Sequence, residues 1–127
     1  MPRPALARPT VRLPAASAKV PAQLVFPDGR VIALDDPEYD VYLTTLMPLG
    51  LPLASGALAL VIPEKRGRGG RYWVARAYRD GVREAVYVGS RPDAESLRRA
   101  QVELNGRFHA RRVGGAFGFT GPAASKA

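Results

Sequence analysis

The stretch RYWVARAYRDGVREAVYVG, residues 71–89, alternates large and small side chains on both sides of an Asp-Gly pair. Alternation of this kind is typical of two β-strands, and Asp80-Gly81 suits a two-residue hairpin turn. One face of that hairpin carries Trp73, Ala75, Ala77, Val86 and Val88, and the other carries Tyr72, Val74, Arg76, Tyr78, Arg83, Ala85 and Tyr87. Small alanines on the first face allow a helix to approach it, so we expect the second face to point outward.

The turn length and the surroundings of the second face leave two alternatives open. A two-residue turn places Arg76 opposite Ala85, whereas a three-residue loop with a Gly bulge places Arg76 against Glu84 and mixes the faces. In the second alternative, the N-terminal half of the chain packs on the second face and buries its tyrosines, with their hydroxyls at the rim. Each alternative changes which side chains are available to a ligand.

A helix is predicted directly after the hairpin. Ser90, Pro92 and Asp93 are helix-start residues. The positions that follow along one side of the helix are Ala94, Leu97, Gln101, Leu104 and Phe108, with Ala100 beside them. Before the hairpin, ALALVI (57–62) predicts a fully buried strand and PEKRGRGG (63–70) a mobile basic loop. Residues 57–108 therefore predict a three-stranded antiparallel sheet packed on a C-terminal helix.

The N-terminal half predicts a second hairpin and a short helix. Residues 23–34 contain two apolar runs around Pro27-Asp28-Gly29, which is typical of a three-residue hairpin loop. Asp36 is the expected N-cap of the helix, with Pro37 at its first position. The acidic residues here are Asp35, Asp36, Glu38 and Asp40. They lack calcium-loop spacing, so helix-start chemistry explains them better than a metal site.

The predicted fold class is α+β, with one domain. Its parts are a disordered basic arm (1–21), an α+β domain (22–112, made of 22–50 and 57–108) and a disordered tail (113–127). Residues 41–63 carry no charge over a length that can cross a bilayer. Pro48 and Pro52 oppose a helix there, so a helix end, a Pro/Gly loop and a buried strand form the preferred interpretation.

The charge distribution favours a polyanionic partner. The net charge is +8, and the basic excess lies in residues 1–20 and 64–112, while the segment between them is acidic. There is no Cys, and His109 is the single His. The GRGG segment (67–70) matches neither a phosphate loop nor a dinucleotide fingerprint. We therefore expect a non-enzymatic cytoplasmic protein, associated with the nucleoid, without cofactor or metal.

The segment GRYWVARAYRDGVREAVYVGSRPDAESLRRAQVEL (70–104) resembles the last two strands and the helix of the ethylene-response-factor (APETALA-type) DNA-binding domain. It is similar also to the related arm-binding domains of phage and transposon integrases. The resemblance implies a three-stranded sheet in the major groove of DNA, with Arg76, Tyr78, Arg83 and Tyr87 facing the DNA. The first strand, ALALVI, lacks the alternating Arg that the family places there, which shifts expected contacts toward residues 65–71.

The sequence as a whole predicts a small DNA-binding protein, a regulator or accessory factor of a phage or mobile element. Duplex DNA is favoured as partner, with RNA left open. The expected binding residues are Lys65, Arg66, Arg68, Arg71, Tyr72, Arg76, Tyr78, Arg83 and Tyr87. The alternative is a protein-interaction adaptor or inhibitor whose Arg/Tyr face docks on an acidic protein. The N-terminal half offers a further surface for a protein partner.

Overall fold

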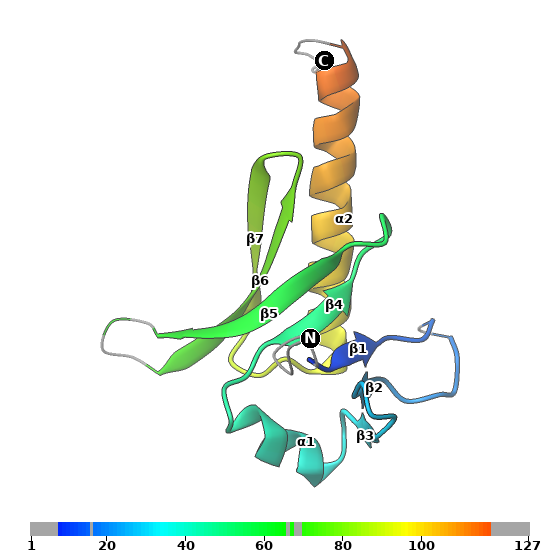
Figure 1. Ribbon diagram of the computed structural model, residues 1–127, viewed down its shortest axis with the longest axis vertical. Coiled ribbons are helices and arrows are strands. Elements are labelled where there is room, and N and C mark those ends of the chain that lie inside the picture. The colour runs from blue at the N-terminus through cyan, green and yellow to red at the C-terminus, as the bar shows by residue number, and fades with distance from the viewer. Residues whose placement is uncertain (1–7, 16, 66, 68–69, 118–127) are drawn as a thin grey trace, which may run out of the picture.

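The computed structural model describes residues 8–15, 17–65, 67 and 70–117. Within them the chain is α+β, with a seven-stranded mixed sheet and two helices (Figure 1). The elements are β1 (Thr10–Arg12), β2 (Gln23–Val25), β3 (Val31–Ala33), α1 (Pro37–Leu43), β4 (Leu49–Pro52), β5 (Leu58–Lys65), β6 (Arg71–Arg79), β7 (Val82–Gly89) and α2 (Ala94–Phe117). The strand order is β3-β2-β1-β4-β5-β6-β7. Only the β1–β4 pair among these is parallel.

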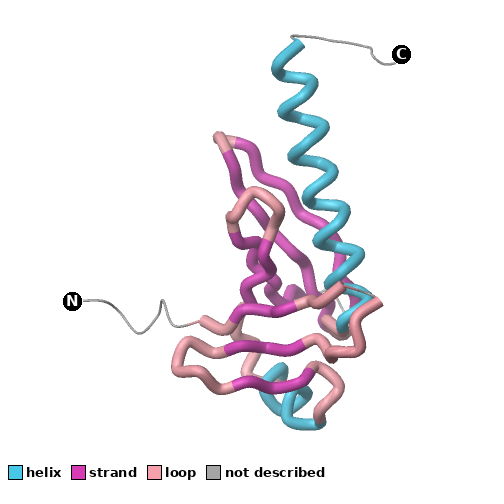
Figure 2. The backbone as a smooth tube through the Cα atoms, turned by 90° about the vertical axis from the view of Figure 1, so that its right-hand side faces the viewer, coloured by secondary structure: helices cyan, strands magenta, loops and turns pink. Residues whose placement is uncertain are grey.

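Helix α2 packs along one face of the β6–β7 hairpin, as Figures 1 and 2 show. Leu97, Ala100 and Leu104 are fully buried on the helix, and they meet a sheet face with buried Trp73 and Ala75. The predicted helix start is confirmed, since the Asp93 carboxylate accepts a hydrogen bond from the Ser96 backbone N–H at 2.8 Å. The core therefore lies between α2 and this face of the sheet.

The hairpin of residues 71–89 has the two-residue turn. Arg79 pairs with Val82, and the turn residues Asp80 and Gly81 have φ angles of 52° and 80°. Positive φ at both positions is the type I′ geometry that Asp-Gly favours. Arg76 consequently lies opposite Ala85, and the three-residue alternative is excluded. The expected division of the hairpin into two faces follows from this register.

The N-terminal hairpin is confirmed and continues the sheet. Gly29 has a φ of 99°, and the Phe26 N–H donates to the Arg30 carbonyl at 2.8 Å, so three residues form the loop. The hairpin pairs edge to edge with β1, so it does not lie over the Arg/Tyr face of residues 71–89. Burial of the Arg/Tyr face by the N-terminal hairpin is therefore excluded.

Helix α1 has the predicted start. The Asp36 side chain accepts from the Glu38 N–H at 2.8 Å. Tyr39 of this helix is fully buried and donates its hydroxyl to the Pro92 carbonyl at 2.7 Å, which ties α1 to the start of α2. Burial raises the pKa of the Tyr39 hydroxyl well above its usual value.

The predicted disordered ends need correction. Residues 10–12, inside the expected arm, form β1, and Val11 is buried between β2 and β4. A three-residue strand is too short to show a periodic pattern. At the other end α2 runs to Phe117, past the expected boundary at 112, because glycines cost a helix only about 1 kcal/mol each. Residues 1–7 and 118–127 lie outside the described residues.

The central uncharged segment also differs from expectation. The predicted Pro/Gly loop contains β4, with Leu49 and Leu51 fully buried. Strand β5 extends to Lys65, which shortens the predicted loop, and it is buried on one side only, with Leu58 48% exposed. Neither helix within the described part of the chain is long and apolar enough to cross a membrane.

Candidate functional site

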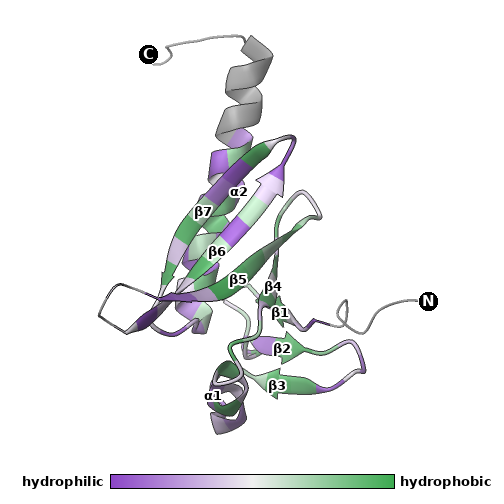
Figure 3. Cartoon of the chain, turned by 60° about the vertical axis from the view of Figure 1, so that its left-hand side comes forward, coloured by the Kyte–Doolittle hydropathy of each residue, from purple (hydrophilic) through white to green (hydrophobic). Residues whose placement is uncertain are grey.

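The side of β5, β6 and β7 that faces away from α2 is the candidate site, and we call it the outer face. It carries Leu58, Leu60, Ile62 and Glu64 of β5, Tyr72, Val74, Arg76 and Tyr78 of β6, and Arg83, Ala85 and Tyr87 of β7. Figure 3 shows apolar and polar positions alternating along β6 and β7 beside a mostly apolar β5. Tyr78 and Tyr87 are 64% and 52% exposed, so the face is open to a ligand.

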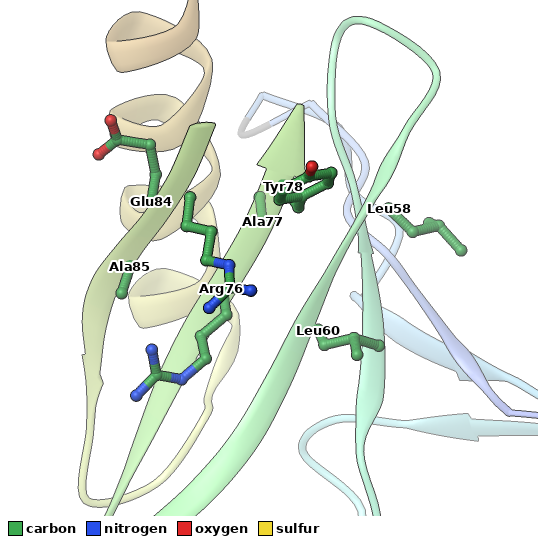
Figure 4. Close-up of a pocket in the computed structure, with 8 residues that line it drawn as sticks. Leu58, Leu60, Arg76, Ala77, Tyr78, Glu84 and Ala85 are labelled. Carbon is green, nitrogen blue, oxygen red and sulfur yellow. The ribbon is translucent and has the colours of Figure 1, made fainter. Parts of the chain in front are cut away.

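A groove runs over this face, with a volume of about 680 Å³. Its lining residues are Leu58, Leu60, Arg76, Tyr78, Arg83 and Ala85 of the outer face, together with Ala77 and Glu84, whose side chains lie on the α2 side. Figure 4 shows Arg76 and Tyr78 of β6 between the leucines of β5 and the β7 residues Glu84 and Ala85. The lining therefore combines an aromatic ring, apolar side chains and two guanidinium groups, which suits a ligand that has both flat apolar surface and negative charge.

One of these cations is already paired. The Glu64 carboxylate accepts from Arg76 Nε at 2.8 Å and also contacts Arg76 Nη2, while its second oxygen accepts from the Tyr72 hydroxyl at 3.2 Å. The hydrogen bond from Arg76 is the main cause that lowers the pKa of Glu64 below its usual value. Arg76 lies on the predicted face, but its charge is compensated from the neighbouring strand.

The lowered pKa of Glu64 can be measured by NMR titration of its side-chain carboxyl. We expect a midpoint below the usual range in the wild type and a return toward that range in Arg76→Ala. Because the folded pKa is depressed, the pair stabilises the fold above the unfolded pKa, and this contribution is lost as the pH falls through the folded pKa. An unchanged Glu64 midpoint in Arg76→Ala would contradict the pairing.

Arg83 differs from Arg76 in its surroundings. It is exposed opposite Tyr78, and no carboxylate of the described residues lies within ion-pair distance of it. The adjacent Glu84 lies on the other side of the strand, where it accepts from Arg107 of α2 at 3.2 Å. Arg83 therefore offers its guanidinium donors to a ligand beside an exposed aromatic ring.

A second basic feature lies at the β5–β6 connection, which we call the hairpin end. Lys65 and Arg71 are exposed and directly opposite each other across the two strands. Like charges in this arrangement destabilise a sheet. Their side chains alternate to the opposite side from Glu64 and Tyr72. The other predicted cations of this loop, Arg66 and Arg68, lie outside the described residues.

The structure thus divides the predicted site in two. Tyr72, Arg76, Tyr78, Arg83 and Tyr87 share the outer face, while Lys65 and Arg71 belong to the hairpin end. Tyr72 is half-buried, and its ring lies 5.8 Å from the ring of Tyr87.

Sequence reasoning missed Glu64, Leu58 and Leu60 as members of the site. The alternating pattern of β5 is the signal that places all three on one side, since Glu64 pairs with Tyr72 and Leu60 with Arg76. Assigning β5 as fully buried concealed this pattern.

The remaining titratable candidates have structural roles. Asp36 caps α1, and Asp40 accepts from Arg91 at 2.7 Å, as expected for helix-start acids rather than ligands. No group of three or more metal-ligating side chains occurs among the residues that the structure describes. His109 is exposed in the second half of α2. No protein-family model, curated protein or solved structure matches the chain.

Proposed function

We propose that the chain is a non-enzymatic nucleic-acid-binding protein, a regulator or accessory factor that acts on DNA through the outer face and the hairpin end. The observation that carries this proposal is the open outer face, where Tyr78 and Tyr87 are more than half exposed beside Arg83. Aromatic rings stack on bases, and a guanidinium binds phosphate or base edges. This face joins both groups on one rigid hairpin.

The hairpin end supports the same proposal through its charges. Lys65 and Arg71 repel each other in the free protein, and a polyanion bound between or beside them relieves that repulsion. Neutral ligands gain nothing from this arrangement. The resemblance to ethylene-response-factor domains adds support, since the strand-strand-strand-helix order that it implies is the order of β5, β6, β7 and α2.

The roles of the two outer-face arginines differ in this proposal. Arg76 holds its donors against Glu64, so it contributes mainly as part of the surface, while Arg83 makes the direct ionic contact. The tyrosines supply the stacking area. Lys65 and Arg71, whose side chains point to the other side of the sheet, hold the phosphate backbone where it passes around the hairpin end.

The experiment is a salt titration with the full chain. Binding of fluorescein-labelled oligonucleotides, single-stranded and duplex, is followed by anisotropy between 50 and 300 mM NaCl. We expect log Kd to rise linearly with log salt with a slope of about 2 to 3, because three cations release counterions at roughly 0.7 to 0.9 each. Absence of binding to every oligonucleotide at 50 mM salt would refute the proposal and favour an acidic protein partner.

A further inference from the structure

We infer that the outer face binds single-stranded nucleic acid, with one base stacked on Tyr78 and a second base on Tyr87. This inference rests on the proposed function and specifies its ligand. It differs from the duplex expectation that follows from the family resemblance. Three features of the outer face support this inference. They are the spacing of the two tyrosine rings, the room for a nucleotide between these rings, and the small number of cationic hydrogen-bond donors without an acidic partner.

The ring spacing follows from the strand register. Tyr78 pairs with Arg83 and Tyr87 pairs with Val74, so the two tyrosines are four strand positions apart. At about 3.3 Å per residue this separation is roughly 13 Å along the hairpin. A duplex strand advances about 3.4 Å per nucleotide, so an unstacked strand at roughly twice that rise covers the distance in two steps. The rings therefore fit bases i and i+2 of an extended strand.

The surface between the rings leaves room for the intervening nucleotide. Arg76 and Ala85 form the pair midway between the tyrosines. Ala85 has a small side chain, and Arg76 is held against Glu64 on the β5 side. The groove of about 680 Å³ lies over this position, with Leu58 and Leu60 as its apolar wall. A sugar or an unstacked base is apolar enough to pack there.

A duplex uses this face poorly. Reading the major groove needs several free donors aimed at base edges, and within the described outer face Arg83 is the cation without an acidic partner. Duplex bases are stacked on one another, so they leave the faces of Tyr78 and Tyr87 uncovered. Single strands gain about 1 to 3 kcal/mol for each base that stacks on an aromatic ring.

The test compares a labelled mixed-sequence 12-mer with its duplex at 100 mM NaCl, in both DNA and RNA form. We expect each single strand to bind at least ~10-fold tighter than the corresponding duplex. Tyr78→Ala should weaken single-strand binding by about 10-fold, while Tyr78→Phe, which keeps the ring, should bind as the wild type does. Val31→Ala, at an exposed apolar position on β3, is the matched control and should change nothing.

Oligonucleotide length provides a second measurement. A trinucleotide reaches both rings and a dinucleotide reaches one, so competition by the trinucleotide should be stronger. Tyr78→Ala should abolish that difference. Tighter binding of the duplex, or equal weakening of both forms in Tyr78→Ala, would overturn the inference while leaving the proposed function intact. Absence of binding to either form would instead remove the proposed function itself.

Discussion

Replacing Leu97 by Ala is expected to lower the free energy of unfolding by about 3 kcal/mol. Leu97 is fully buried on α2, and it belongs to the same core cluster as Trp73 and Val88 of the sheet. Ala75 is fully buried in this cluster too, and its methyl group cannot extend into the vacated space. A domain of this size has about 5 to 15 kcal/mol of stability, so the loss is a large share.

Urea unfolding followed by circular dichroism measures the effect, with Val102→Ala as the control. Val102 lies on the same helix and is 68% exposed, so its truncation should change stability by less than about 0.5 kcal/mol. The comparison separates loss of packing from any change in helix propensity. A loss below about 1 kcal/mol for Leu97→Ala would show that α2 does not pack closely on the sheet.

The faces of the β6–β7 hairpin were predictable because local chemistry fixes them. Asp80-Gly81 accepts positive φ at both positions, and once the turn has two residues the pairs from Arg79–Val82 to Val74–Tyr87 follow. A register shift between Trp73 and Val74 then pairs Trp73 with Gly89, and the turn does not predict it. Because side chains alternate along β6, Trp73 lies on the buried face and Tyr78 on the exposed face. The helix starts at Asp36 and Asp93 were predictable for a similar reason, since each cap bonds to a residue two or three positions away.

The partner of Arg76 was not predictable in this way. The contact with Glu64 depends on the β5–β6 register, in which Glu64 pairs with Tyr72 and lies diagonally across from Arg76. The Gly- and Arg-rich connection between these strands does not specify a register through any turn residue. The sequence places two cations, Arg76 and Arg83, on the outer face. In the fold, the charge of Arg76 is compensated by Glu64.

The pairing of β1 with β4 depends on contacts between distant parts of the sequence. The Gly50 N–H donates to the Pro9 carbonyl at 2.9 Å, and a Cβ at Gly50 would lie 3.5 Å from that carbonyl oxygen and 3.4 Å from Thr10 Oγ1. In the sequence, Gly50 falls within the segment expected to be a Pro/Gly loop. In the structure the same glycine lies where two strands approach closely, which a local pattern does not reveal.

Replacing Lys65, Arg71 and Arg83 together by Ala is expected to weaken oligonucleotide binding by about 100-fold at 100 mM salt. Each lost phosphate contact removes roughly 0.7 from the slope of log Kd against log salt, which is close to a fivefold loss at this salt concentration. Removing Lys65 and Arg71 also removes their mutual repulsion, so the variant should unfold at an equal or higher urea concentration than the wild type. If the variant is as stable as the wild type, its weaker binding results from the lost contacts and not from unfolding.

A matched control separates the proposed surface from general charge attraction. Arg12, Lys19 and Arg30 are exposed cations near the opposite end of the sheet, and replacing these three by Ala lowers the net charge equally. We expect this control to weaken binding by less than about fivefold, because long-range attraction is screened beyond a Debye length of about 10 Å at this salt. If both triple variants weakened binding equally, binding would depend on the net charge alone. That result would contradict a role for the outer face and the hairpin end.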